Sequence, residues 1–164
     1  MRIRTAVLSD LDALTAVEAA CFPAAEAAGR DSIARRLEAY PDHFWLLETE
    51  AGEIAAFING LATDESILRD EMYENAALHN EAGAWQMIFG VDTLPQYRRR
   101  GFAAELMEHV IAQAKAQGRK GCVLTCKEPL IHYYEKFGYR KEGVSESVHG
   151  GARWYDMRLT FSRL

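Results

Sequence analysis

The stretch Val91-Asp-Thr-Leu-Pro-Gln-Tyr-Arg-Arg-Arg-Gly-Phe-Ala103 connects two different patterns of apolar residues. The residues before it form an apolar run that is typical of a buried strand, and Pro95 ends that strand because proline has no backbone donor. After Gly101 the apolar residues recur at spacings of three and four, which predicts a helix that ends at Gly118. The sequence therefore predicts a strand, an arginine-rich turn and a helix in direct succession.

The start of this predicted helix is suited to bind phosphate groups. The first amides of a helix have no partner within it and carry a partial positive charge, which favours an anion by about 0.3–1 kcal/mol per contact. Gly101 allows a ligand to approach the backbone closely, and Ala103 keeps the approach open. Arg98, Arg99 and Arg100 add positive charge around it. The chain has no G-x-x-x-x-G-K-[ST] or G-x-G-x-x-G motif, so nucleotide chemistry is not indicated.

Two blocks of the sequence carry a resemblance to a known family. The pattern Arg98-x-x-Gly101-x-Ala103 resembles the R/Q-x-x-G-x-G/A motif of the GNAT superfamily of acyl-CoA-dependent N-acetyltransferases. The block from Leu124 to Tyr139, with Tyr-Glu-Lys-Phe-Gly-Tyr at its end, looks like the later motif of the same family. The residues of this block and of Glu18-Ala-Ala-Cys-Phe-Pro23 are most similar to those of the arylalkylamine (serotonin) N-acetyltransferase branch. The resemblance covers nearly the whole chain in order and spacing.

The resemblance implies a fold. Strands outnumber helices in the predicted order of elements, and two helices follow strands in β-α-β fashion, which favours a mixed α/β class. The family fold is a single domain, here residues 1–164, with a mixed central β-sheet and helices on both faces. Its two central strands splay apart to admit the pantetheine arm of the cofactor, and by resemblance these are Trp85–Thr93 and Cys122–Thr125.

The resemblance also implies acetyl-CoA as the cofactor. Backbone amides on the splayed strand would contact the pantetheine and the thioester, and amides of the turn would hold the pyrophosphate. Lys127 stands where the family often has an asparagine that contacts the cofactor, so its role is open between a phosphate contact and cover for the strand end. The predicted cofactor-binding residues are Val91, Thr93, Arg98, Arg99, Arg100, Gly101, Phe102, Ala103, Lys127 and Lys136.

Acyl transfer to an amine also requires proton transfers. Tyr134 falls where the family places its general-acid tyrosine, and a phenol with a pKa near 10 is suited to protonate a leaving thiolate. Tyr133 is the alternative acid. The arylalkylamine branch has two histidines on the strand before the turn, but Met87 and Phe89 stand there and neither accepts a proton.

The base must therefore lie elsewhere, or be water. Glu26 is the predicted catalytic base, because the segment that contains it lies near the acceptor by analogy. His79 and Glu81, in the long irregular segment from residue 62 to residue 84, are the other candidates.

Composition limits the other classes of function. The net charge of −5 disfavours nucleic acid as a partner. Residues 1–83 carry a net charge of −10 and residues 84–164 one of +5, which suits an anionic cofactor in the second half and a cationic partner in the first. No apolar run is long enough to span a membrane, and no secretory signal is present, so we expect a cytoplasmic protein. Three cysteines fit a reducing compartment, and no spacing predicts a metal site.

The sequence thus predicts an N-acetyltransferase that moves an acetyl group from acetyl-CoA directly to a primary amine of a small molecule through a ternary complex. An arylalkylamine or a polyamine fits the acceptor, and family members often form homodimers. Two alternatives stay open: a non-catalytic acyl-CoA-binding sensor, and acetylation of a protein amine. A covalent route through Cys126 or Cys21 is disfavoured, because an apolar strand raises the pKa of a thiol. A hydrolase is disfavoured because the chain has no G-x-S-x-G motif.

Overall fold

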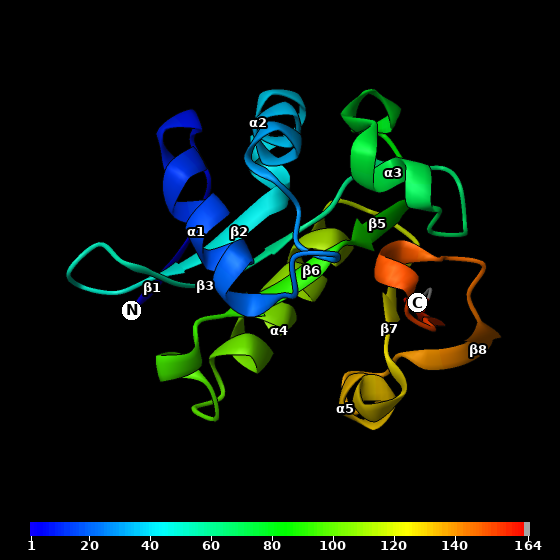
Figure 1. Cartoon of the computed structure of the whole chain (residues 1–164). Helices are drawn as coiled ribbons and strands as arrows, with labels where there is room; N and C mark the ends of the chain where they lie inside the picture. The colour runs from blue at the N-terminus through cyan, green and yellow to red at the C-terminus, as the bar shows by residue number, and fades with distance from the viewer. Residues whose placement is uncertain (163–164) are drawn as a thin grey trace. The chain divides into compact units, whose positions relative to one another are not determined.

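The computed structural model describes residues 1–162 of the chain, and Figure 1 shows the succession of its elements. Backbone contacts divide the chain into two units. Unit 1 consists of Met1–Gly60 and Gly90–Val110, and unit 2 of Leu61–Phe89 and Ile111–Leu164, whose last two residues are not described. Among the described residues, no helix is long and apolar enough to cross a membrane.

Unit 1 contains a four-stranded sheet in which every pair is antiparallel. Its strands, in spatial order, are β1 (Arg2–Thr5), β2 (Phe44–Glu48), β3 (Ile54–Asn59) and β6 (Gly90–Thr93). Helices α1 (Leu11–Cys21) and α2 (Arg30–Ala39) contact each other, and α1 packs on β3 and β6. In Figure 1 the two helices, in blue, lie beside the strands of this sheet. Strand β6 is an edge strand of the sheet.

Apolar residues at helical spacing build the core of unit 1. Leu14 and Val17 of α1, together with Ile33 and Leu37 of α2, are buried against Phe57 of β3. A spacing of three and four residues puts such side chains on one face of a helix, and that face covers the sheet. The face of β6 that carries Asp92 is therefore covered by α1, because Asp92 pairs with Phe57 and shares its side of the sheet.

Unit 2 contains a five-stranded sheet of mixed type. Its spatial order is β4 (Ala62–Thr63), β5 (Trp85–Ile88), β7 (Gly121–Cys126), β9 (Tyr155–Thr160) and β8 (Arg140–Val144). Strands β5 and β7 are parallel, and the other pairs are antiparallel. Helix α5 (Ile131–Glu135) contacts β8 and β9. Helix α3 (Asp70–Glu74) lies in the segment from residue 62 to residue 84, for which the sequence predicts irregular structure.

Helix α4 (Phe102–Ala116) follows the arginine turn, as predicted, and its residues fall in both units. The remaining regular segments are short 3₁₀ turns at Leu8–Asp10, Pro41–His43, Ala76–Leu78, Pro95–Tyr97, Glu128–Leu130 and His149–Gly151.

The strand predicted over residues 85–93 differs from the observed structure. It divides at Phe89 into β5 and β6, which belong to different sheets. The parallel register of β5 with β7 ends at Ile88 and Leu124, whereas β6 pairs with β3 from Gly90 onward. The physical reason is that the backbone changes its hydrogen-bonding partner from β7 to β3 at this point. The run of apolar residues continues through the change, so the sequence does not mark it.

Candidate active site

The predicted pantetheine-binding amides belong to the edge strand β6. Phe57 faces Asp92 across the β3–β6 ladder, and the amide of Leu94 donates to the carbonyl of Ala55 at 3.0 Å. Hydrogen-bonded and non-hydrogen-bonded pairs alternate along an antiparallel ladder, so the amides of Val91 and Thr93 point away from β3. Both therefore lie along the outer edge of the sheet of unit 1, as a ligand that adds a strand-like contact requires.

Two side chains fix the carbonyl of Thr93. The thiol of Cys21, at the end of α1, donates to this oxygen at 3.3 Å, and Nε of Arg98 donates to it at 2.9 Å. Arg98 was predicted to bind the cofactor, and in this structure it also ties the turn back to the end of β6. The orientation of the Thr93 peptide group is thus fixed by two hydrogen bonds, one from a residue earlier in the chain and one from a residue later in it.

The backbone of the arginine turn is left-handed at two positions. Gly101 has φ of 80°, and Arg99 has φ of 64°, the only positive value for a non-glycine residue in the described part of the chain. A left-handed conformation costs roughly 1–2 kcal/mol for a residue with a side chain, and such strain is typical of functional turns. Successive amides in turns of this kind converge and form concave sites for anions.

Helix α4 begins directly after this turn. Its first internal hydrogen bond runs from the amide of Glu105 to the carbonyl of Gly101, at 3.0 Å. The amides of Phe102 and Ala103 precede it and have no partner in the helix. The guanidinium of Arg100 lies 5.8 Å from the ring centroid of Tyr97 and is exposed. Amides, helix dipole and exposed guanidinium groups together favour a diphosphate.

The predicted acid lies in unit 2. Tyr134 is buried on α5, and its ring packs edge-to-face against Tyr133 at 5.2 Å and Tyr139 at 6.0 Å. Burial raises the pKa of the Tyr133 hydroxyl, so it is a neutral phenol at physiological pH. The ring of Tyr139, which lies outside α5, packs against that of Tyr134 and helps to position the Tyr134 side chain.

The two predicted lysines also belong to unit 2 and are in different environments. Lys127 follows β7, is half-buried, and places its ammonium 5.5 Å from the ring centroid of Trp154. This distance is within the range of a cation–π contact. Lys136 is exposed at the end of α5. Of the two, Lys127 has the more defined position.

Glu26, the predicted base, lies in unit 1 in the turn that follows α1. Its amide donates to the carbonyl of Pro23 at 2.9 Å, and its side chain is half-buried. The amide of Ala28, two residues later, donates to the carboxylate of Glu18 at 2.9 Å, which holds this connection against α1. Glu26 and the β6 amides are therefore part of the same unit.

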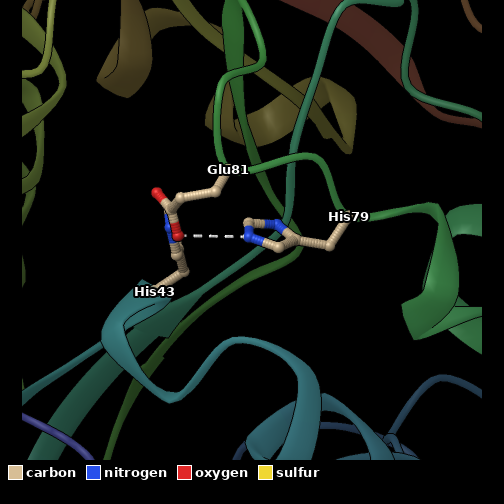
Figure 2. Close-up of side chains that lie close together, drawn as sticks. All are labelled: His43, His79 and Glu81. Carbon is tan, nitrogen blue, oxygen red and sulfur yellow. Dashed lines mark hydrogen bonds and ion pairs between the residues drawn. The ribbon is translucent and has the colours of Figure 1, made fainter.

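The other two candidate bases have structural roles. Nδ1 of His79 accepts a hydrogen bond from the amide of Ala62 at 3.1 Å, so its proton is on Nε2, which lies 3.3 Å from Glu81 (Figure 2). Glu81 also accepts from the buried Arg119 at 3.0 Å. Of the residues drawn in Figure 2, these two belong to unit 2, and His43 is a buried residue of unit 1. His79 has no lone pair to spare for an acceptor amine.

Replacement of His79 tests this assignment. We expect His79→Leu to lower the free energy of unfolding by about 1–3 kcal/mol, because the amide of Ala62 loses its acceptor. His79→Asn offers an oxygen near the position of Nδ1 and retains most of the stability. Denaturant unfolding measures both effects, and turnover of each folded variant should stay within about twofold. A loss of turnover in His79→Asn at unchanged stability would contradict the structural role.

The three cysteines are free thiols and poor nucleophiles. Burial raises the pKa of Cys122 to about 12 and that of Cys126 to about 11. Burial also raises the pKa of Cys21, although Arg98 opposes the shift. The thiolate is the reactive form of cysteine, so a raised pKa leaves all three thiols protonated and poorly reactive at neutral pH.

Sequence reasoning missed a pair of acids in unit 1. Asp92 of β6 is fully buried, and Glu18 of α1 is nearly so. Burial, and then the neighbouring Glu18, raise the pKa of Asp92 well above its usual range. The available signal was the position of Glu18, seven residues after Leu11 on the apolar face of the helix.

Comparison with known proteins identifies the class of protein that this strand, turn and helix define. The chain belongs to the Acetyltransferase (GNAT) family, whose sequence model matches residues 11–139. The fold predicted from the sequence is thereby confirmed. The closer resemblance to the arylalkylamine branch stays a prediction.

Three solved structures illustrate the likeness. The chain is 26% identical to the GphF GNAT-like decarboxylase in complex with isobutyryl-CoA, with a TM-score of 0.83 over 98% of this chain and 99% of that one. It is 18% identical to the loading GNATL domain of CurA from Lyngbya majuscula, with a TM-score of 0.84 over 97% and 96% of the two chains. It is 19% identical to the ribosomal-protein-S18-alanine N-acetyltransferase from Escherichia coli, with a TM-score of 0.72 over 99% and 95%.

Proposed function

We propose that this protein is an acetyl-CoA-dependent N-acetyltransferase that acts on a primary amine of a small molecule. The observation that carries the proposal is the continuity of the donor elements. The outward amides of β6, the left-handed turn at Arg99 and Gly101, and the start of α4 occur within 13 residues of one unit. Family membership supports an acyl-CoA donor, and the predicted acid on α5 supports catalysis rather than sensing.

The residues of unit 1 would bind and orient the donor. Acetyl-CoA supplies an activated thioester, and its pantetheine would run along the outer edge of β6. The amides of Val91 and Thr93 would hydrogen-bond to it and polarise the carbonyl that receives the amine. The amides of Phe102 and Ala103, with the guanidinium of Arg100, would hold the diphosphate. These residues fit the group in polarity and in charge.

Two residues would move protons. Tyr134 would give its hydroxyl proton to the sulfur that leaves when the amide bond forms. Glu26 would accept a proton from the amine, which must be neutral to attack. Because the three cysteines are protonated, the acyl group would pass directly to the amine. We therefore expect sequential kinetics.

Replacement of Glu26 tests the base. We expect Glu26→Gln to lower kcat by about 30-fold, less than the loss of a well-placed base, because water can accept the proton instead. Steady-state measurement of kcat at saturating amine and acetyl-CoA is the assay. Asp31→Asn, which removes an exposed acid at the start of α2, is the matched control. Equal kcat values for the wild type and Glu26→Gln would assign the proton to water.

A thiol-release assay tests the proposed function. Acetyl-CoA is supplied with arylalkylamines, polyamines, amino acids, aminoglycosides and peptides with a free N-terminus, and calorimetry measures acetyl-CoA affinity in parallel. We expect turnover with a cationic, partly apolar amine, since residues 1–83 are acidic. Turnover with peptides alone would assign a protein amine as acceptor. Tight binding without turnover on any amine would assign a sensor.

The likeness to the decarboxylase favours a second candidate function, decarboxylation of a carboxylated acyl-CoA. In that reaction the bond between the carboxyl carbon and its neighbour breaks, carbon dioxide leaves, and the neighbouring carbon takes up a proton. The lack of an ionisable side chain at Met87 and Phe89 agrees with a reaction that needs no amine deprotonation. Malonyl-CoA is the probe: this function releases carbon dioxide and leaves the thioester intact.

A further inference from the structure

Asp92 occupies an unusual position in the proposed donor strand. Its neighbours Val91 and Thr93 present their amides to the outer edge of β6, whereas its own side chain points to the α1 side of the sheet. It is fully buried, and neither of its carboxyl oxygens receives a hydrogen bond from a donor among residues 1–162. A buried carboxylate without a hydrogen-bond donor is too costly in free energy to persist, so we expect the carboxyl of Asp92 to carry a proton.

Glu18 is the partner that makes this proton useful. It is buried on α1, which packs on β6, and its nearby carboxyl contributes to the raised pKa of Asp92. It also accepts a hydrogen bond from the amide of Ala28 at 2.9 Å. Two carboxylates cannot hydrogen-bond to each other, but a carboxylic acid donates to a carboxylate strongly. One proton shared by the pair therefore satisfies Asp92 and ties α1 to β6. The net charge of the two carboxyl groups is then −1, and burial of this charge costs less free energy than burial of a charge of −2.

The surroundings decide how firmly the proton is held. The guanidinium of Arg36 on α2 favours ionisation of Asp92, but burial, Glu18 and the thiol of Cys21 outweigh it. Arg36 also donates to the buried Asn59 at 3.0 Å, so part of its hydrogen-bonding capacity is directed to a second polar group. Gly90 leaves the space that the acid needs, because a Cβ at this position would lie 2.9 Å from Oδ1 of Asp92.

We propose that Glu18 and Asp92 are positioning residues that share one proton and thereby hold β6 in the conformation that binds acyl-CoA. The inference rests on the proposed function, since it assigns the amides of Val91 and Thr93 to the donor. Loss of the proton leaves two carboxylates that repel each other between α1 and β6. The end of α1 also carries Cys21, which fixes the carbonyl of Thr93, so separation of α1 from β6 disturbs the donor-binding edge directly. Donor affinity therefore falls with rising pH.

The first test needs no variant and no ligand. Nuclear magnetic resonance of the labelled wild-type chain follows the side-chain carboxyl carbon of Asp92 against pH. We expect this carboxyl to titrate well above the ordinary aspartate value of about 3.9. Titration near that ordinary value would overturn the proposal, because the pair would then hold no shared proton.

The second test measures acetyl-CoA affinity by calorimetry from about pH 6 to about pH 9. Once Asp92 loses its proton, the wild-type Kd should rise by up to about tenfold per pH unit, as expected when the protonated form alone binds. Asp92→Asn keeps a permanent donor to Glu18, and its curve should be flat across the range. Glu18→Gln provides the same rescue from the other side. A wild-type slope that persists in both variants overturns the proposal.

These two tests separate the inference from the proposed function. If the wild type does not bind acetyl-CoA at any pH, the proposed function fails, and the carboxyl titration still decides whether the pair shares a proton. If acetyl-CoA binds with an affinity that is independent of pH across the titration of Asp92, the proposed function stands and the positioning role is wrong.

Discussion

Replacement of Tyr134 by Phe should lower kcat by about two to four orders of magnitude, while the affinity for acetyl-CoA stays within about twofold. The variant removes one hydroxyl from a buried ring and leaves the packing against Tyr133 and Tyr139 in place. A proton donor contributes to the transition state and little to donor binding, so the loss appears in kcat and kcat/KM together. Steady-state kinetics and calorimetry measure the two effects.

Tyr133→Phe is the matched control, because it removes the hydroxyl of a half-buried tyrosine on the same helix. We expect a kcat within about threefold of the wild type in this variant. Inverted results would assign the acid to Tyr133. If both variants keep full activity over the whole pH range, neither phenol donates the proton, and the role of α5 in catalysis is wrong.

The strand–turn–helix unit was predictable because the periodicity of the apolar residues changes within a short stretch. The sequence predicts a helix from about Gly101 to Gly118, and the structure has α4 over Phe102–Ala116. The division of the preceding strand at Phe89 was not predictable in the same way. Apolar residues continue on both sides of it, and the partners that separate β5 from β6 are distant in sequence.

Local sequence also concealed two features of the site. In Arg-Arg-Arg-Gly, glycine is the residue expected to be left-handed, yet Arg99 is left-handed as well. Glu18 sits on an apolar helix face, and Asp92 lies between strand residues. Each acid is unremarkable alone, and their pairing depends on how α1 packs on β6.

The turn itself gives the second large effect. We expect Gly101→Asp to weaken acetyl-CoA binding by about 100-fold, because it places a negative charge beside the proposed diphosphate site. Gly101→Ala is the matched control. No atom outside the turn lies within 4 Å of a Cβ at this position. Both variants are therefore destabilised mainly by the strain of a residue with a side chain at φ of 80°. That conformational strain is about 1–2 kcal/mol, and it lowers the free energy of unfolding more than the affinity for acetyl-CoA. The difference between the two variants therefore isolates the charge.

Two further measurements locate the charge effect. At about 1 M salt the Debye length falls to about 3 Å, so the penalty of Gly101→Asp relative to Gly101→Ala should shrink to about tenfold. With S-acetylpantetheine, which lacks the diphosphate, the two variants should bind equally. Equal affinities of the two variants for acetyl-CoA as well would mean that no phosphate lies at this turn. In that case the outward amides of β6 lose their assigned ligand too, because the same 13 residues would have to position both parts of it.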